Sequence, residues 1–68
     1  MCRNIKQLRR PEGPPTDQEL HDAALQFVRK VSGYRVPSRA NRAAFDAAVD
    51  EIAAATRRMF RRLIVKAG

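Results

Sequence analysis

The chain has few of the residues that stabilise a small secreted domain or a membrane protein. It holds one cysteine in 68 residues, so an internal disulfide is excluded. No apolar run approaches the about 20 residues of a membrane-spanning helix. The N-terminus also lacks an apolar stretch of the signal-peptide type. These absences predict a cytoplasmic protein with no membrane span.

Large apolar residues are scarce as well. Leucine, isoleucine, valine and phenylalanine make up 15 of the 68 residues, tryptophan is absent, and 11 residues are alanine. At 7.7 kDa, a folded monomer buries only about 60% of the surface that its unfolded chain exposes. Because alanine buries little area, we expect a homo-oligomer or a larger partner to supply the missing burial.

Residue sets that carry out catalysis or bind metals are missing. His21 is the single histidine and Cys2 the single cysteine, too few for a metal-binding set or a Cys–His–Asp triad. The sequence has neither a catalytic pair of carboxylates nor a glycine-rich phosphate loop. We therefore expect no enzymatic activity, no catalytic residue, no metal and no cofactor. His21 is interpreted as a solvated or Asp-paired side chain.

The chain is organised as an arm followed by a helical hairpin. Residues 1–15 are a basic N-terminal arm and proline-rich linker, in which the prolines exclude a helix. Residues 16–68 carry two amphipathic segments, which predict helices over about 17–32 and 39–64. A short loop makes consecutive helices antiparallel neighbours. The predicted fold class is all-α: an antiparallel two-helix hairpin, open to dimerisation, with the arm packing on the longer second helix.

Local signals mark the ends of the first helix and the start of the second. Thr16 and Glu19 have the spacing of a capping box, which predicts a helix start at Asp17. Gly33 fits the left-handed position that ends a helix. Because Pro37 excludes a helical conformation at the residue before it, we expect Ser38 to cap the second helix.

Apolar residues at helical spacing predict the packing faces. The first helix should bury five residues: Leu20, Ala24, Phe27, Val28 and Val31. The second helix carries a longer apolar stripe, which we assign to self-association or arm packing: Phe45, Val49, Ile52, Met59, Phe60 and Leu63. Pairing outward from the loop sets Phe27 near Phe45. The far end of the stripe then extends past the first helix, where Ile5 and Leu8, or another chain, would cover it.

The charge of the chain is strongly positive and unevenly distributed. The formal net charge is +7, and the basic residues are 11 arginines and three lysines. Basic and acidic blocks alternate, so each expected helix begins acidic and ends basic, as the helix macrodipole prefers. Arginine in excess favours polyanions, because its planar guanidinium forms paired hydrogen bonds with phosphate. We assign polyanion binding to six arginines: Arg39, Arg42, Arg57, Arg58, Arg61 and Arg62.

Two alternatives to this assignment stay open. The arginines after residue 56 can form a solvated face, with Glu12 and Asp17 reaching Arg57 and Arg58 across the hairpin. Separately, Cys2 can form a thiol site together with Arg3 and Asn4, because a neighbouring positive charge favours the thiolate. Such a site would serve redox sensing or the binding of a metal or cofactor.

Several segments resemble one family. They are Met1-Cys2-Arg3-Asn4-Ile5-Lys6, Pro14-Pro15-Thr16, the stretch from Ala23 to Gly33 that contains Phe27-Val28-Arg29-Lys30, and Pro37-Ser38-Arg39-Ala40-Asn41. Together they resemble a family of short bacterial proteins of unknown function that begin Met-Cys-Arg-Asn-Ile. The resemblance implies a small cytosolic helical protein, and it implies no activity, ligand or catalytic residue. Members have fewer arginines after the Arg58 position, so Arg61 and Arg62 depart from the family pattern.

The sequence as a whole predicts a small non-enzymatic helical binding module. Its arginine-rich faces are expected to dock a polyanionic partner, with nucleic acid or a ribonucleoprotein first and an acidic protein surface next. The alternatives are the thiol-dependent role of Cys2 and a protein-assembly role for the apolar stripe of the second helix.

Overall fold

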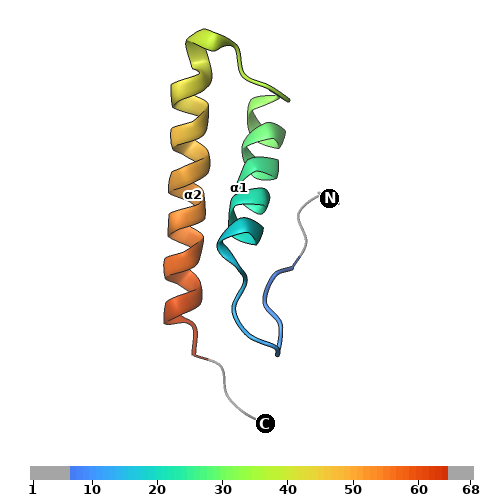
Figure 1. Ribbon diagram of the computed structural model, residues 1–68, viewed down its shortest axis with the longest axis vertical. Helices are drawn as coiled ribbons and strands as arrows, with labels where there is room; N and C mark the ends of the chain where they lie inside the picture. The colour runs from blue at the N-terminus through green and yellow to red at the C-terminus, as the bar shows by residue number, and fades with distance from the viewer. Residues whose placement is uncertain (1–6, 65–68) are drawn as a thin grey trace.

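The computed structural model describes residues 7–64 and contains two packed helices. Helix α1 spans Asp17–Ser32, the short 3-10 helix η1 spans Arg39–Asn41, and helix α2 spans Arg42–Arg62. Figure 1 shows α1 and α2 side by side and antiparallel, joined by the loop of residues 33–38. No strand occurs between residues 7 and 64. The predicted all-α class and the packing of the two helices are confirmed.

Helix α1 begins and ends with the signals that the sequence predicts. The Glu19 backbone N–H donates to Thr16 Oγ1 at 3.1 Å, and the Thr16 backbone N–H donates to Glu19 Oε1 at 2.8 Å. This reciprocal pair is the capping box. At the other end, Gly33 has a φ of 78°, and its N–H donates to the Arg29 carbonyl oxygen at 2.9 Å. A residue with a Cβ is strained in that conformation, which explains the glycine.

Helix α2 differs from its prediction at both ends. Ser38 forms no capping hydrogen bond with a backbone N–H; its Oγ instead accepts from Asn41 Nδ2 at 3.1 Å. The chain passes through η1 first, so the regular helix starts three residues later than expected. It ends at Arg62, because Leu63 is extended with a ψ of 133°. The apolar residues that follow include β-branched Ile64, whose type has a lower helix propensity than alanine.

The core is one line of side chains from each helix. Its members are Leu20, Ala24 and Val28 on α1, with Phe45, Val49 and Ala53 on α2. Both lines have a spacing of four residues. The ion pair between Asp17 and Arg57, one turn beyond the core, therefore aligns Leu20 with Ala53 and Val28 with Phe45. The two alanines let the helix axes approach closely, although they add little buried area.

Two residues of the expected core are exposed. Phe27 retains 45% and Val31 retains 65% of its accessible surface, so the prediction that they are buried is wrong. Val28, and not Phe27, aligns with Phe45, and this places Phe27 at the edge of the helix pair. Val31 lies a further turn toward the loop, beyond Phe45, the first buried residue of α2. Nothing on α2 covers it there.

The described part of the arm folds back against the hairpin. In Figure 1 the segment before α1 turns sharply and runs back to the start of that helix. The turn lies at residues 11 and 12. A backbone hydrogen bond of 3.4 Å from the Gly13 N–H to the Arg10 carbonyl closes this turn. Leu8 is half-buried and packs against the core, whereas Ile5 lies outside the described residues. The expected return of the arm is thus seen at Leu8.

Candidate polyanion-binding surfaces at the two ends of the hairpin

At the open end, where α1 begins and α2 ends, carboxylates hold two of the arginines. Arg57 Nη2 lies 2.7 Å from Asp17 Oδ1. Arg10 donates twice to Glu19, from Nη1 to Oε2 at 2.7 Å and from Nη2 to Oε1 at 2.8 Å. The capping box of α1 therefore also fastens the arm. Of the two expected ion pairs across the hairpin, that between Asp17 and Arg57 is present.

Glu19 accepts hydrogen bonds from both Arg10 and Thr16, and these bonds shift the pKa of its carboxyl group. The hydrogen bonds from Arg10, followed by the one from the Thr16 backbone N–H, lower the pKa of Glu19 from 4.5 to about 2. Conversely, the hydrogen bond and the charge of Glu19 raise the pKa of Arg10. Glu12 is 4.0 Å from Arg10 Nε, so its nearest cation is on the arm and it does not pair with Arg58. Arg10 and Glu19 neutralise each other.

Three further arginines at the open end are exposed: Arg58, Arg61 and Arg62. Within the described chain none of them forms an ion pair. They lie in the last two turns of α2, where the negative end of the helix dipole stabilises cations. Arg57 differs, because its Nε is buried with no hydrogen-bond partner among the described residues. Its guanidinium is committed to the contact with Asp17.

At the loop end, positive charge accumulates without acidic residues between positions 29 and 45. The loop-end patch consists of five basic side chains: Arg29, Lys30, Arg35, Arg39 and Arg42. They come from the last turn of α1, the loop, η1 and the start of α2. Lys30, Arg35 and Arg39 are exposed and have no ion-pair partner in residues 7–64. Arg42 Nε lies 3.5 Å from Asp46 Oδ2, and both side chains stay more than half exposed.

The start of α2 adds to this positive potential. The first turn of α2 holds no acidic residue, and no side chain caps its backbone N–H groups. The expectation that each helix begins acidic is therefore wrong for α2, because the helix starts at Arg42 and its first acid is Asp46. The positive end of a helix dipole and nearby arginines attract the same ligand, an anion.

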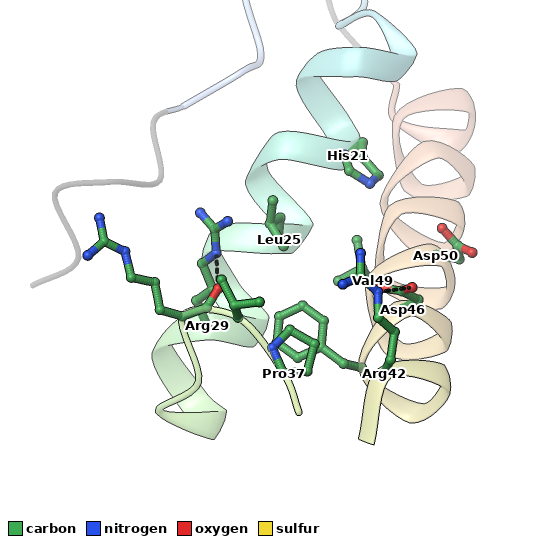
Figure 2. Close-up of a pocket in the computed structure, with 11 residues that line it drawn as sticks. His21, Leu25, Arg29, Pro37, Arg42, Asp46, Val49 and Asp50 are labelled. Carbon is green, nitrogen blue, oxygen red and sulfur yellow. Dashed lines mark hydrogen bonds and ion pairs between the residues drawn. The ribbon is translucent and has the colours of Figure 1, made fainter. Parts of the chain in front are cut away.

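A groove lies beside the loop-end patch, between the two helices. Figure 2 shows His21, Leu25 and Arg29 on α1 facing Arg42, Asp46 and Val49 on α2. Its volume is about 440 Å³. Arg29 forms the wall near the loop, where its Nε donates to the Arg35 carbonyl oxygen at 3.0 Å. This bond holds the loop against α1 and leaves the terminal nitrogens of Arg29 at the rim.

The groove has an apolar base and a charged rim. Apolar side chains, including Phe45 and Val49, form its base, while arginines and the carboxylates of Asp46 and Asp50 form its rim. His21 Nδ1 lies 3.7 Å from Asp22 Oδ1, and both side chains are about half exposed or more. That pair matches the interpretation of His21 as solvated or Asp-paired. No nucleophile adjoins it among the residues that line the groove.

The structure separates the predicted polyanion site into two groups. Arg39 and Arg42 belong to the loop-end patch, whereas Arg57, Arg58, Arg61 and Arg62 lie at the open end. The prediction omitted Arg29, Lys30 and Arg35, although all lie in the basic block of residues 29–42. The run of basic residues without acids from position 29 to 42 could have indicated that these three side chains belong to the same surface. What the sequence does not show is that the turn brings both ends of the block together.

The predicted apolar stripe is also divided. Phe45 and Val49 are buried against α1 and are not available to another chain. Ile52 and Phe60 are half-buried, while Met59 and Leu63 retain 48% and 41% of their accessible surface. Leu8 of the arm lines a hollow together with Ile52, Met59 and Phe60. The arm thus faces the part of the stripe that extends toward the open end.

Three further observations concern the predicted thiol site, metal ligands and membrane-spanning helices. The possible thiol site of Cys2, Arg3 and Asn4 lies outside the described residues. In the part of the chain that the structure describes, no three histidine or carboxylate side chains are grouped as metal ligands. None of the described helices is both long and apolar enough to cross a membrane.

Comparison with known proteins assigns a family without an activity. No curated protein and no solved structure matches the chain. One family model, described as an uncharacterized conserved protein, matches residues 1–68. The expected resemblance to a family of unknown function is confirmed at this level, while a bacterial origin and a shared opening motif stay predictions. Since the match covers the whole sequence, the chain belongs to the uncharacterized conserved protein family DUF2277.

Proposed function

We propose that this protein is a non-enzymatic binding module whose loop-end patch docks a polyanionic partner, with nucleic acid first. The observation that supports the proposal is the concentration of five basic side chains at one end of the hairpin, with no acid between positions 29 and 45. A cluster of this kind attracts phosphates over distances of a Debye length and steers association.

The loop end suits a polyanion better than the open end. At the open end, Asp17 and Glu19 already occupy Arg57 and Arg10. A phosphate there would have to compete with these short ion pairs. At the loop end, Arg42 has a longer and exposed contact with Asp46, which costs little to exchange. The positive end of the α2 helix dipole, with no acidic residue in the first turn, adds to the attraction for a phosphate.

The ligand is expected to be recognised by its backbone and not by its base sequence. Lys30, Arg35 and Arg39 are surface side chains, and no side-chain ion pair within residues 7–64 fixes their orientation toward a base edge. Contacts of this type position a protein on phosphates and carry no sequence information. An acidic protein surface offers the same charge, although carboxylates are less densely spaced than the phosphates of a duplex.

Salt-dependent binding to a short duplex and a single strand tests the proposal. The variant Lys30→Gln/Arg35→Gln/Arg39→Gln removes three charges from the loop end. Because each lost phosphate contact lowers the salt slope by about 0.9, the slope should fall by up to about 2.7 units. All three side chains are exposed, so helicity by circular dichroism should not change.

A matched control is available at the open end. The variant Arg58→Gln/Arg61→Gln/Arg62→Gln removes the same number of exposed charges from α2. It should lower affinity through net charge alone and leave most of the slope in place. Equal losses in both variants would mean that the two ends bind equally. Absence of binding at low salt to either nucleic acid would contradict the proposal.

A further inference from the structure

We infer that two copies of this chain associate through α2, in an antiparallel arrangement with two-fold symmetry. The surface concerned is a second stripe on α2, beside the one that faces α1. This outer stripe consists of Ala48, Ile52, Ala55, Met59 and Arg62. The residues are spaced alternately four and three apart, which is the spacing of a helix–helix seam.

The outer stripe is accessible in the described structure. Ala55 is exposed at its centre, Met59 retains 48% of its accessible surface, and Ala48 and Ile52 are half-buried at the border with α1. The alanines allow two helix axes to approach within about 8 Å. A bulky residue at position 55 would prevent that approach, so this stripe is already shaped for close contact with another helix.

A two-fold axis brings the two halves of the outer stripe together. The first half presents Ala48 and the half-buried Ile52, whereas the second half presents the more exposed Met59. A two-fold axis between Ala55 and Thr56 brings Met59 of the partner subunit onto Ile52. Each contact then occurs twice, because an isologous interface repeats every pair of residues across its axis.

The charged residues beside the outer stripe are also complementary across this two-fold axis. Glu51 is exposed on one flank of the outer stripe, and Arg58 and Arg62 lie on the same flank two and three turns later. Within one chain, Arg58 and Arg62 are four residues apart and repel each other by a few tenths of a kcal/mol. The two-fold axis places Glu51 between Arg58 and Arg62 of the partner subunit. The contact that relieves the repulsion is therefore supplied by a second copy.

Association with a second copy would also bury apolar surface that a single chain leaves exposed. Among residues 7–64 the core contains six buried residues, of which two are alanine, and no large side chain there is fully buried. Leu8 lines a hollow that Ala23 and Phe27 of α1 also line, so this residue packs on the side of α2 that faces α1. A parallel pair of α2 helices would instead bring the arginines of both chains together. Charge complementarity thus favours the antiparallel arrangement.

Sedimentation equilibrium of the full chain measures this association. A mass about twice 7.7 kDa should appear as protein concentration rises. Glu51→Arg should raise the dissociation constant about tenfold, as loss of an interfacial charge pair does. Arg58→Glu/Arg62→Glu should weaken association in the same way. Combining all three substitutions restores opposite charges across the axis and should return the constant to within about threefold of the original value.

Asp50→Arg is the matched control, because it makes the same charge change on the adjacent residue, which faces the groove. It should leave the dissociation constant within about twofold. Ala55→Trp provides a second variant that blocks close approach without changing charge. A monomer at all concentrations, equal effects of Asp50→Arg and Glu51→Arg, or failure of the triple variant to restore association would overturn the proposal. The loop-end triple variant should still associate, which separates this inference from polyanion binding.

Discussion

The two ends of the hairpin carry similar numbers of basic residues but have different electrostatics. At the open end, the acidic start of α1 lies beside the basic end of α2, so Asp17 and Glu19 find arginine partners within 2.8 Å. At the loop end, the basic end of α1 lies beside the basic start of α2, with no acid until Asp46. The antiparallel arrangement therefore pairs Arg10 and Arg57 with carboxylates at the open end, where Arg58, Arg61 and Arg62 stay unpaired, and leaves most of the loop-end patch without acidic neighbours. Net charge alone does not locate a binding surface.

The largest expected effect concerns the core, which extends to the open end but stops short of the loop end. Leu20→Ala should lower the free energy of unfolding by about 3 kcal/mol, since it removes a side chain that is 2% exposed. Urea denaturation followed by circular dichroism measures the loss. Val31→Ala is the control at the loop end and should change stability by less than about 0.5 kcal/mol. Equal losses would show that α2 covers Val31 after all.

Low pH should destabilise the open end of the hairpin, because Glu19 becomes protonated there. Because the folded-state pKa is lowered from 4.5 to about 2, the stabilisation is fully present above pH 4.5 and is lost as pH falls toward 2. The melting temperature should therefore fall across this window, and Glu19→Gln should flatten that fall. Arg10→Gln should flatten it in part, because the Thr16 backbone N–H still donates to the carboxylate. If both variants kept the pH profile of the unmodified protein, the Arg10–Glu19 ion pair would not be the cause of the acid sensitivity.

At the loop end, Gly33→Ala should destabilise the protein by about 1 kcal/mol, because alanine is strained in the left-handed region. A Cβ at this position meets no atom within 4 Å, so the cost is conformational and not steric. Gly33→Asn should cost less, since asparagine tolerates this conformation better. Thermal denaturation distinguishes the two. If Gly33→Ala stabilised the chain, the entropy of the unfolded state would outweigh the strain.

The smallest expected effect comes from releasing single arginines. Asp17→Asn should cost about 0.5 kcal/mol, because the carboxylate is 82% exposed. It frees Arg57 at the open end, where we expect no change in the salt slope of polyanion binding. Asp46→Asn frees Arg42 at the loop end and should steepen the slope by up to about 0.9. The reverse result would assign polyanion binding to the open end.

The sequence alone determined the first helix and the class of the fold. Its signals are local: the Thr16–Glu19 capping box and Gly33 each act within four residues, so their effect does not depend on the rest of the chain. The helical period of the apolar residues identified most of the core for the same reason. The start of α2 was less predictable, because Pro37 and Ser38 are also compatible with the intervening turn of 3-10 helix.

Tertiary structure decided which residues meet, since that depends on register. The alignment of Val28 with Phe45 leaves Phe27 at an edge, which periodicity on one helix does not reveal. Arg10 reaches Glu19 across nine residues only because the chain turns back at Gly13. Likewise, Arg29 and Arg42 border one groove because the loop returns α2 beside α1. Composition provided the arginines, and the packing of the helices determined which of them are already paired.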